Sequence, residues 1–361
     1  MLEAHLIKLP FMKWLCPNIN IGQSMKNRLT CVIKHPIFHC SYPIKTFGYM
    51  LFIFHSLLLA TPATADYAPV TVPMEVQKVS EHVYFVQGKA GIATDNEGFI
   101  SNAGFIITGD GVVVFDSLGT PSLAAQLVKE IHKITKQPIK RVIASHYHAD
   151  HIYGLQVFED MGIKISAPEG AYTYLNSPAA KERLEERQFS LEPWVNENTH
   201  LVKPDEIISQ STTFKMGDVT FTINYQGKAH SDGDLAMLVE PDRVLFSGDI
   251  IFEGRIPYVG DADTKHWLSV MEKLETTGLK ALVPGHGPAS TDPAKTIALT
   301  RKYLAYLREK MGAAAENFIA FDEAYAKTDW SEFKDLPAFD EGNRINAYQV
   351  FLSMEAEMLK E

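Results

Sequence analysis

Short apolar runs recur along the chain after residue 80, and most of them are rich in β-branched and aromatic residues. Such runs, bounded by glycine and polar residues, predict β-strands. The predicted strands are 82–86, 103–108, 112–115, 141–144, 219–225, 235–239 and 244–246. Asp110-Gly111 lies between two of these runs and predicts a tight hairpin turn.

Helical periodicity appears between and after the strands. Thr120 as N-cap, with Pro121 in the first turn, predicts the start of a helix. The apolar stripe of this helix is Leu123, Leu127, Ile131 and Ile134. Further helices are predicted near 265–275, 293–310 and 346–359. Grouped strands with interspersed helices predict an α+β (α/β) domain over residues 66–361, in which two mixed sheets pack face to face and helices cover them, with further helices at the C-terminal end.

One segment near the N-terminus does not fit a globular domain. Residues 47–60 form an almost unbroken apolar run after Lys26, Arg28, Lys34 and Lys45, and Ala63-Thr64-Ala65 follows it. A basic flank, a short apolar stretch and a small-x-small site are typical of a secretory signal peptide. We therefore expect residues 1–65 to comprise a signal peptide and an over-extended N-terminus. Cleavage after Ala65 would give a periplasmic or secreted protein without a membrane anchor.

Removing this leader changes the cysteine count and the charge. Cys16, Cys31 and Cys40 all lie within it, so the mature chain has neither a disulfide nor a thiolate metal ligand. The leader also holds six of the 34 Lys and Arg residues and one of the 44 Asp and Glu residues, so the formal net charge changes from −10 to −15. An acidic chain argues against a nucleic-acid partner.

The segment SHYHADH at residues 145–151 holds three histidines and one aspartate. On a helix, His146 and His148 would point about 200° apart, so both can face one point only on an irregular loop. Three more metal-ligand candidates follow apolar runs at His230, Asp249 and His286. The full candidate set is His146, His148, Asp150, His151, His230, Asp249 and His286. Imidazole and carboxylate ligands suit Zn²⁺, and Fe or Mn would also fit.

These motifs resemble those of the metallo-β-lactamase-fold superfamily. HxHxDH is present at residues 146–151, AHxxGD at 229–234, SGD at 247–249 and PGHG at 284–287. The resemblance implies a four-layer αβ/βα sandwich. It also implies that His146, His148 and His230 hold a first zinc, that Asp150, His151 and His286 hold a second, and that Asp249 bridges the two. Superfamily branches with cysteine at the Asp249 position are excluded.

The resemblance implies hydrolysis of a small-molecule substrate. Two zinc ions would activate a shared water as hydroxide, and Asp150 would orient or deprotonate that water as the catalytic residue. The predicted function is an exported dinuclear zinc hydrolase acting on an ester, thioester, lactone or lactam. The exported context and residues 247–264 are most similar to periplasmic relatives associated with sulfur-oxidation or quinoprotein systems. The alternatives are a non-catalytic metal-binding accessory protein of a periplasmic redox system and a mononuclear iron persulfide dioxygenase.

Residues around the cluster have predicted supporting roles. The family aspartate that braces the metal loop corresponds to Asp116. The loop 90–102 is expected over the metals, with Phe99 as its apolar contact. Lys228, Tyr147 and Tyr258 are candidates for contact with a substrate anion.

Overall fold

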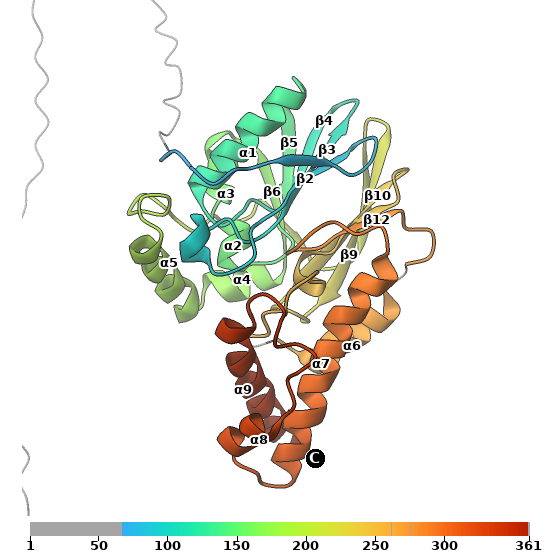
Figure 1. Ribbon diagram of the computed structural model, residues 1–361. Helices are drawn as coiled ribbons and strands as arrows, with labels where there is room; N and C mark the ends of the chain where they lie inside the picture. The colour runs from blue at the N-terminus through green and yellow to red at the C-terminus, as the bar shows by residue number, and fades with distance from the viewer. Residues whose placement is uncertain (1–66, 261, 275, 360–361) are drawn as a thin grey trace, which may run out of the picture. The chain divides into compact units, whose positions relative to one another are not determined.

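The structure is a computed structural model that describes residues 67–359 apart from residues 261 and 275 (Figure 1). The predicted signal peptide lies outside the described residues. Across the part of the chain that is described, no helix has both the length and the apolar character needed to cross a membrane.

Twelve strands in the described residues form two mixed sheets. The first sheet has the order β1-β2-β3-β4-β5-β6-β7, and the second has the order β12-β11-β10-β9-β8. The strands of the first sheet are β1 (Val76–Lys78), β2 (Val83–Val86), β3 (Ala103–Thr108), β4 (Gly111–Phe115), β5 (Ile139–Ile143), β6 (Lys164–Pro168) and β7 (Glu206–Ile208). Those of the second are β8 (Thr212–Met216), β9 (Val219–Gly227), β10 (Asp234–Glu240), β11 (Val244–Phe246) and β12 (Ala281–Val283).

Helices follow the strands as crossovers or lie outside the sheets (Figure 1). The first half of the described chain has α1 (Pro121–Ile134), α2 (Ala149–Ile152), α3 (Leu155–Asp160), α4 (Gly170–Leu175) and α5 (Pro178–Ser190). The second half has α6 (Thr264–Lys273), α7 (Pro293–Glu316), α8 (Phe321–Lys327) and α9 (Phe339–Met358), and two short 3-10 turns are η1 (Ala93–Asn96) and η2 (Gly248–Ile250). Strands β4 to β7 run parallel to one another because helices connect them, whereas β4 is antiparallel to β3.

Alternating strand residues build three apolar layers. In β4, Val112 and Val114 pack toward α1, whereas Val113 and Phe115 pack between the sheets. The second sheet behaves in the same way, since Met237 of β10 faces the other sheet and Ala236 faces the C-terminal helices. Two sheets with helices on both outer faces therefore make the four-layer sandwich that the sequence predicted.

Most of the predicted elements are present, and two details differ. Thr120 caps α1, with Oγ1 accepting a hydrogen bond from the Leu123 N–H at 3.1 Å. Ile134 is 43% exposed and does not continue the buried stripe. The β3–β4 hairpin turns at Gly109 and Asp110, so Gly111 is the first residue of β4. Strand β12 matches the apolar run predicted before His286, whereas strands β1, β6, β7 and β8 and helices α2 to α5 and α8 were not predicted.

Candidate metal centre

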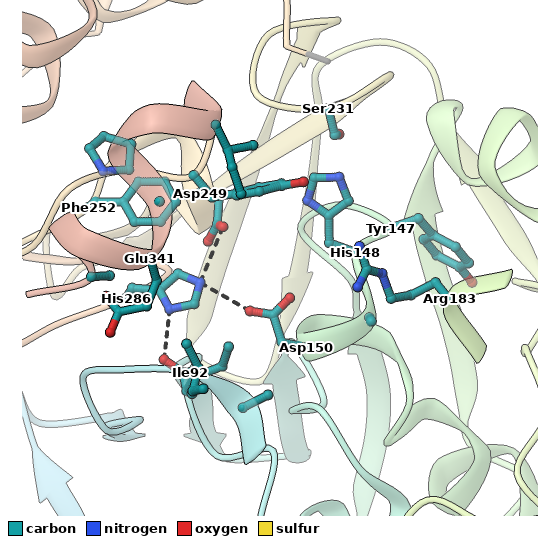
Figure 2. Close-up of a pocket in the computed structure, with 18 of the residues that line it drawn as sticks. Ile92, Tyr147, His148, Asp150, Arg183, Ser231, Asp249, Phe252, His286 and Glu341 are labelled. Carbon is teal, nitrogen blue, oxygen red and sulfur yellow. Dashed lines mark hydrogen bonds and ion pairs between the residues drawn. The ribbon is translucent and has the colours of Figure 1, made fainter. Parts of the chain in front are cut away.

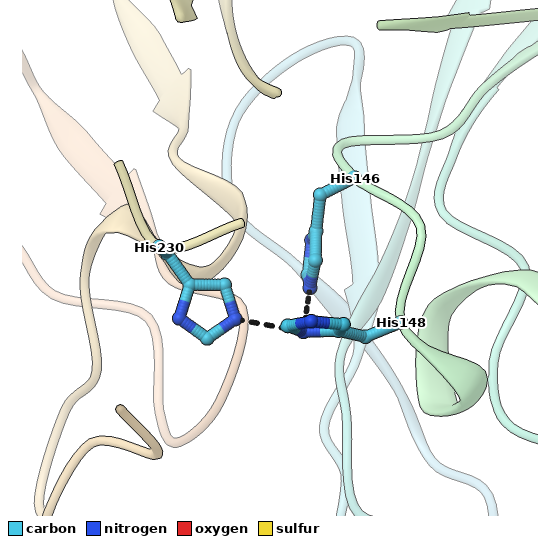
Figure 3. Close-up of side chains that lie close together, drawn as sticks. All are labelled: His146, His148 and His230. Atoms are coloured by element: carbon cyan, nitrogen blue, oxygen red, sulfur yellow. Dashed lines mark hydrogen bonds between the residues drawn. The ribbon is translucent and has the colours of Figure 1, made fainter. Parts of the chain in front are cut away.

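His146, His148 and His230 meet at one point (Figure 3). His148 Nδ1 lies 3.0 Å from His146 Nε2 and 2.9 Å from His230 Nε2. His146 and His148 lie in the loop after β5, as predicted, and His230 lies in the turn between β9 and β10. His148 Nδ1 carries either one proton or one lone pair, so it can make only one of these two contacts a good hydrogen bond, and the nitrogens of the other contact repel each other. A cation at the meeting point would remove that repulsion.

The other predicted ligands gather beside this trio, and Figure 2 shows three of them, Asp150, Asp249 and His286, together with His148. His286 Nε2 lies 3.2 Å from Asp150 Oδ2 and 3.3 Å from Asp249 Oδ2. His151 Nε2 lies 3.5 Å from Asp150 Oδ2 and 3.2 Å from Asp249 Oδ1. Asp150 and His151 belong to the short helix α2, whereas Asp249 lies in η2 after β11 and His286 follows β12. All seven predicted site residues therefore meet at one edge of the sandwich.

The arrangement of the donor atoms suits metal ligation better than it suits hydrogen bonds among these side chains. The 3.2 Å pair of His151 Nε2 and Asp249 Oδ1 does not have hydrogen-bond geometry, and both buried atoms are otherwise without a hydrogen-bond partner. Ligand atoms within 4.8 Å of one another form three groups: His146, His148 and His230; His146, His151 and Asp249; and Asp150, His151 and His286. The first and third groups are the two ligand sets that the resemblance implied, and Asp249 contacts histidines of both.

The protonation of the histidines also suits metal binding. Burial lowers the pKa of His146 well below its ordinary value and lowers the pKa of His230 to about 3, so both rings are neutral. Burial would also lower the pKa of His151, but Asp249, Asp150 and Asp116 outweigh it and raise that pKa well above 6.5. A metal ion on His151 would therefore displace a proton, and ligation would release it to solvent.

Asp116 braces the loop, as the sequence predicted. Its Oδ2 lies 2.9 Å from His151 Nδ1, and its Oδ1 accepts a hydrogen bond from the Ser145 N–H at 2.6 Å. Because a carboxylate only accepts, His151 carries a proton on Nδ1 and directs Nε2 toward Asp249. Ser145 Oγ donates to Asp116 Oδ2 at 2.8 Å and therefore accepts from His146 Nδ1, which leaves Nε2 of His146 as its ligand atom.

Two further buried residues that had no predicted role hold the ligand loops. Asp234 Oδ2 accepts from the backbone N–H groups of Ala229 and Ser231, on either side of His230. Asn102 Nδ2 donates to the carbonyls of Pro284 and Gly287, on either side of His286. Neither residue follows an apolar run in the way that the predicted ligands do. Asp234 is, however, the last residue of the AHxxGD motif, and this motif is the one signal that could have identified it.

Gly285 of the PGHG motif allows Asp249 to reach the centre. A Cβ atom at residue 285 would lie 1.9 Å from Asp249 Oδ1, closer than any side chain permits. The glycine is therefore required by the close approach of the two loops, because any other residue would displace the carboxylate.

A pocket of about 590 Å³ opens onto the ligands, and the residues that line it differ from several of the predicted contacts. The loop 90–102 does line it, but through Ile92, whereas Phe99 is fully buried in the core. Tyr147 lines the pocket, yet its hydroxyl donates to the Val202 carbonyl at 2.8 Å.

Two other candidates for contact with a substrate anion differ in their exposure to the pocket. Lys228 is not among the lining residues and pairs with Asp232 at 2.7 Å. Tyr258 does line the pocket, with its ring plane at 79° to that of His148. Of the two, only Tyr258 can therefore meet a bound molecule in the pocket.

The C-terminal helices supply another wall that the sequence did not predict. Ala338, Glu341, Gly342 and Ile345 near the start of α9 line the pocket. Buried Asn346 joins α9 to the 252–259 loop, because its Oδ1 accepts from the Val259 N–H at 2.9 Å and its Nδ2 donates to the Pro257 carbonyl at 2.7 Å. Helix α9 therefore shapes the substrate side of the site as well as the core.

Comparisons with known proteins agree with this geometry. The family model of the metallo-beta-lactamase superfamily matches residues 96–286. The type 2 metallo-beta-lactamases of Elizabethkingia meningoseptica and Bacillus cereus are 24% and 25% identical over 52% and 55% of this chain, in each case covering 69% of the relative. A metallo-beta-lactamase of Chryseobacterium indologenes is 22% identical over 65% of this chain and 90% of its own length.

Solved structures share the fold. A metallo-beta-lactamase from Pontibacter korlensis has a TM-score of 0.51 at 21% identity, covering 64% of this chain and 99% of that one. A stereoselective inverting sec-alkylsulfatase from Pseudomonas sp. has a TM-score of 0.61 at 18% identity, covering 78% of this chain and 50% of that one. With the family match running from before HxHxDH to His286 of PGHG, the chain belongs to the metallo-β-lactamase superfamily and is a metal-dependent hydrolase.

Proposed function

We propose that this protein is a dinuclear zinc hydrolase that cleaves an ester, thioester, lactone or lactam. The observation that carries the proposal is the placement of Asp249, whose carboxylate lies between the His146, His148 and His230 trio and the set of Asp150, His151 and His286. Neutral nitrogen and carboxylate oxygen donors without sulfur suit zinc. Iron or manganese would suit the same donors, so metal analysis decides among them.

Zinc ions bound here would supply an activated water and polarise the scissile oxygen. The chain's own residues control where that water lies. Asp150 faces the pocket, and its Oδ2 is 3.2 Å from His286 Nε2. Burial would raise the pKa of Asp150, but His151 and His286 outweigh it and hold that pKa well below its ordinary range. An ionised Asp150 accepts a hydrogen bond from the attacking water and orients it, and its low pKa makes it a weak proton acceptor.

Elemental analysis combined with a chromogenic substrate panel tests the proposal. The panel contains nitrocefin, thioesters, lactones and carboxylate esters, together with sulfate and phosphate esters, because one structural neighbour is a sulfatase. We expect two zinc ions per chain and turnover on at least one carbonyl substrate. One iron per chain with oxygen consumption on a persulfide would instead identify a dioxygenase.

A pair of histidine variants provides the control for this test. His148→Ala removes a trio ligand and should lower both metal content and turnover, whereas His132→Ala changes an exposed histidine of α1 and should lower neither. Equal activity of the two variants would contradict the site.

We also propose that the protein is exported, with a mature N-terminus at or near Asp66. The basic flank, the apolar run at residues 47–60 and the Ala63-Thr64-Ala65 site support this. Mass spectrometry of protein from the periplasmic or secreted fraction measures the N-terminus directly. An intact leader on that protein would contradict cleavage. The association with sulfur-oxidation or quinoprotein systems stays a prediction.

A further inference from the structure

Three arginines line the pocket of a protein that is acidic as a whole. Arg183 and Arg187 come from α5, and Arg255 comes from the loop after η2. Because the whole chain has a formal net charge of −10, its average field repels anions. Three arginines that line one pocket of such a chain therefore indicate that this pocket requires positive charge.

Arg255 is a partly buried guanidinium with unused donors beside the metal ligands. Its Nε donates to the Ile256 carbonyl at 3.4 Å, and its Nη1 lies 3.5 Å from His286 Nδ1. The second contact is no hydrogen bond, because His286 Nδ1 already donates to the Ile100 carbonyl at 2.7 Å and an arginine only donates. Arg255 is therefore not needed to orient His286.

The acids that face Arg255 do not neutralise it at close range. Among the described residues, no carboxylate oxygen lies within 4.0 Å of its guanidinium nitrogens. Asp150 and Asp249 are directed at histidine nitrogens, and Asp232 pairs with Lys228. Glu341 of α9 is the fourth acid of the pocket, and it too lies beyond ion-pair distance of Arg255. In Figure 2, Glu341 lies on the side of Phe252 and His286, opposite Arg183.

We propose that the pocket takes a substrate that carries an anionic group, a carboxylate, sulfate or phosphate, and that Arg255 donates hydrogen bonds to that group beside the metal centre. This inference rests on the proposed function, because the bound molecule is a substrate only if the protein is a hydrolase. A planar guanidinium matches two oxygens of such an anion, and a charge-assisted pair in a partly buried site is stronger than one in water. Ile92, Ile256 and Ile345 line the same pocket and would contact the apolar remainder of the molecule.

Arg183 and Arg187 have a different role in this proposal. Both lie near the same carboxylate of Glu186, at 3.2 Å from Arg183 Nη1 and 3.4 Å from Arg187 Nε. Arg183 is also about half exposed. Their charges are therefore partly compensated and screened by solvent, and they attract an anion toward the pocket without binding it tightly.

Calorimetric binding of two matched probes to the metal-loaded protein tests the assignment. The anionic probe is p-toluenesulfonate, and the neutral probe of similar shape is p-tolyl methyl sulfone. We compare wild type with Arg255→Gln, Arg255→Lys, the double variant Arg183→Gln/Arg187→Gln and the control Arg301→Gln, which changes an exposed arginine of α7 that does not line the pocket. Every variant is loaded with metal to the wild-type content before titration, so that direct contact of the sulfonate with metal is the same throughout.

We expect wild type to prefer the sulfonate, and Arg255→Gln to lose about tenfold or more of that preference, as for one charge-assisted hydrogen-bonded pair. Arg255→Lys should recover part of it, and Arg301→Gln should match wild type. The α5 double variant should weaken sulfonate binding at about 50 mM salt and much less at about 500 mM. A wild type without preference, or an unchanged preference in Arg255→Gln, would overturn the proposal. Because calorimetry needs no turnover, a failure of the hydrolytic function would not affect this result.

Discussion

His151 Nδ1 lies 2.9 Å from Asp116 Oδ2, and both side chains are buried. This contact keeps a proton on His151 Nδ1, which faces Asp116, and leaves Nε2 facing Asp249. The backbone of Asp116 is in the left-handed region, with φ of 63°, which asparagine also tolerates.

Asp116→Asn should therefore weaken metal binding without misfolding the turn. Loss of the charge and of one acceptor oxygen should lower metal affinity by about 10- to 100-fold. Competition with a chromophoric chelator measures the affinity. Asp335→Asn changes an exposed aspartate that does not line the pocket and is the matched control. Equal affinities of the two variants would show that Asp116 does not position a ligand.

Asp249→Ala should lose one metal more readily than the other. The His146, His148 and His230 trio stays complete, whereas the set of Asp150, His151 and His286 loses the carboxylate that lies 3.2 Å from His151 Nε2. Elemental analysis during stepwise dialysis should show one metal leaving first. Simultaneous loss of both metals would count against a bridging carboxylate, and full retention would remove Asp249 from the site.

Asp150→Asn should reduce turnover by about 10² or more, since a positioned acceptor for the attacking water is lost. Steady-state kinetics at equal metal content measure the effect. Asp232→Asn makes the same change at another pocket aspartate, which pairs with Lys228, and should have a much smaller effect. Near wild-type turnover of Asp150→Asn with both metals bound would reduce Asp150 to a structural residue of the loop.

Asn346→Leu should destabilise the protein and disturb the pocket from a distance. The change leaves the Val259 N–H and the Pro257 carbonyl without their partner, which costs about 1–3 kcal/mol of unfolding free energy for each buried group left unpaired. Thermal denaturation measures the loss, and Asn198→Ala at an exposed position is the control. A melting temperature equal to that of the control variant would mean that α9 does not hold the 252–259 loop.

His82 should make stability depend on pH outside the metal centre. Burial would lower its pKa, but pairing with Asp242 at 2.7 Å and with Asp218 at 3.3 Å outweighs burial and raises the pKa above 6.5. A raised folded-state pKa adds stability that is fully present below the unfolded pKa and is lost as pH rises through the folded value. His82→Ala should therefore lower Tm more at about pH 6 than at about pH 9, by about 2 °C. The same penalty at both pH values would show that the ion pairs contribute nothing.

The sequence by itself was enough to identify the candidate metal ligands and to predict the sandwich fold that carries them. His146 and His148 are two residues apart after an apolar run, and that local spacing excludes a shared helix face and indicates a loop at the end of the strand. The repeated placement of His230, Asp249 and His286 after apolar runs indicated one sheet edge. Thr120 and Pro121 likewise marked a helix start through local hydrogen-bonding rules, which depend on neighbours in sequence.

Only the tertiary structure decided which residues surround the substrate. Asn102 binds carbonyls more than 180 residues away, and Asn346 binds a loop 87 residues away, so no local pattern could reveal either contact. Phe99 and Ile92 are both apolar residues of one loop, and their roles were separated only when packing buried Phe99 and left Ile92 on the pocket. Arg255 is one of many arginines in the sequence, and its lack of a close carboxylate follows from where distant acids fold. Ligand spacing is therefore a local property of this chain, whereas the pocket is set by contacts between segments that are far apart in sequence.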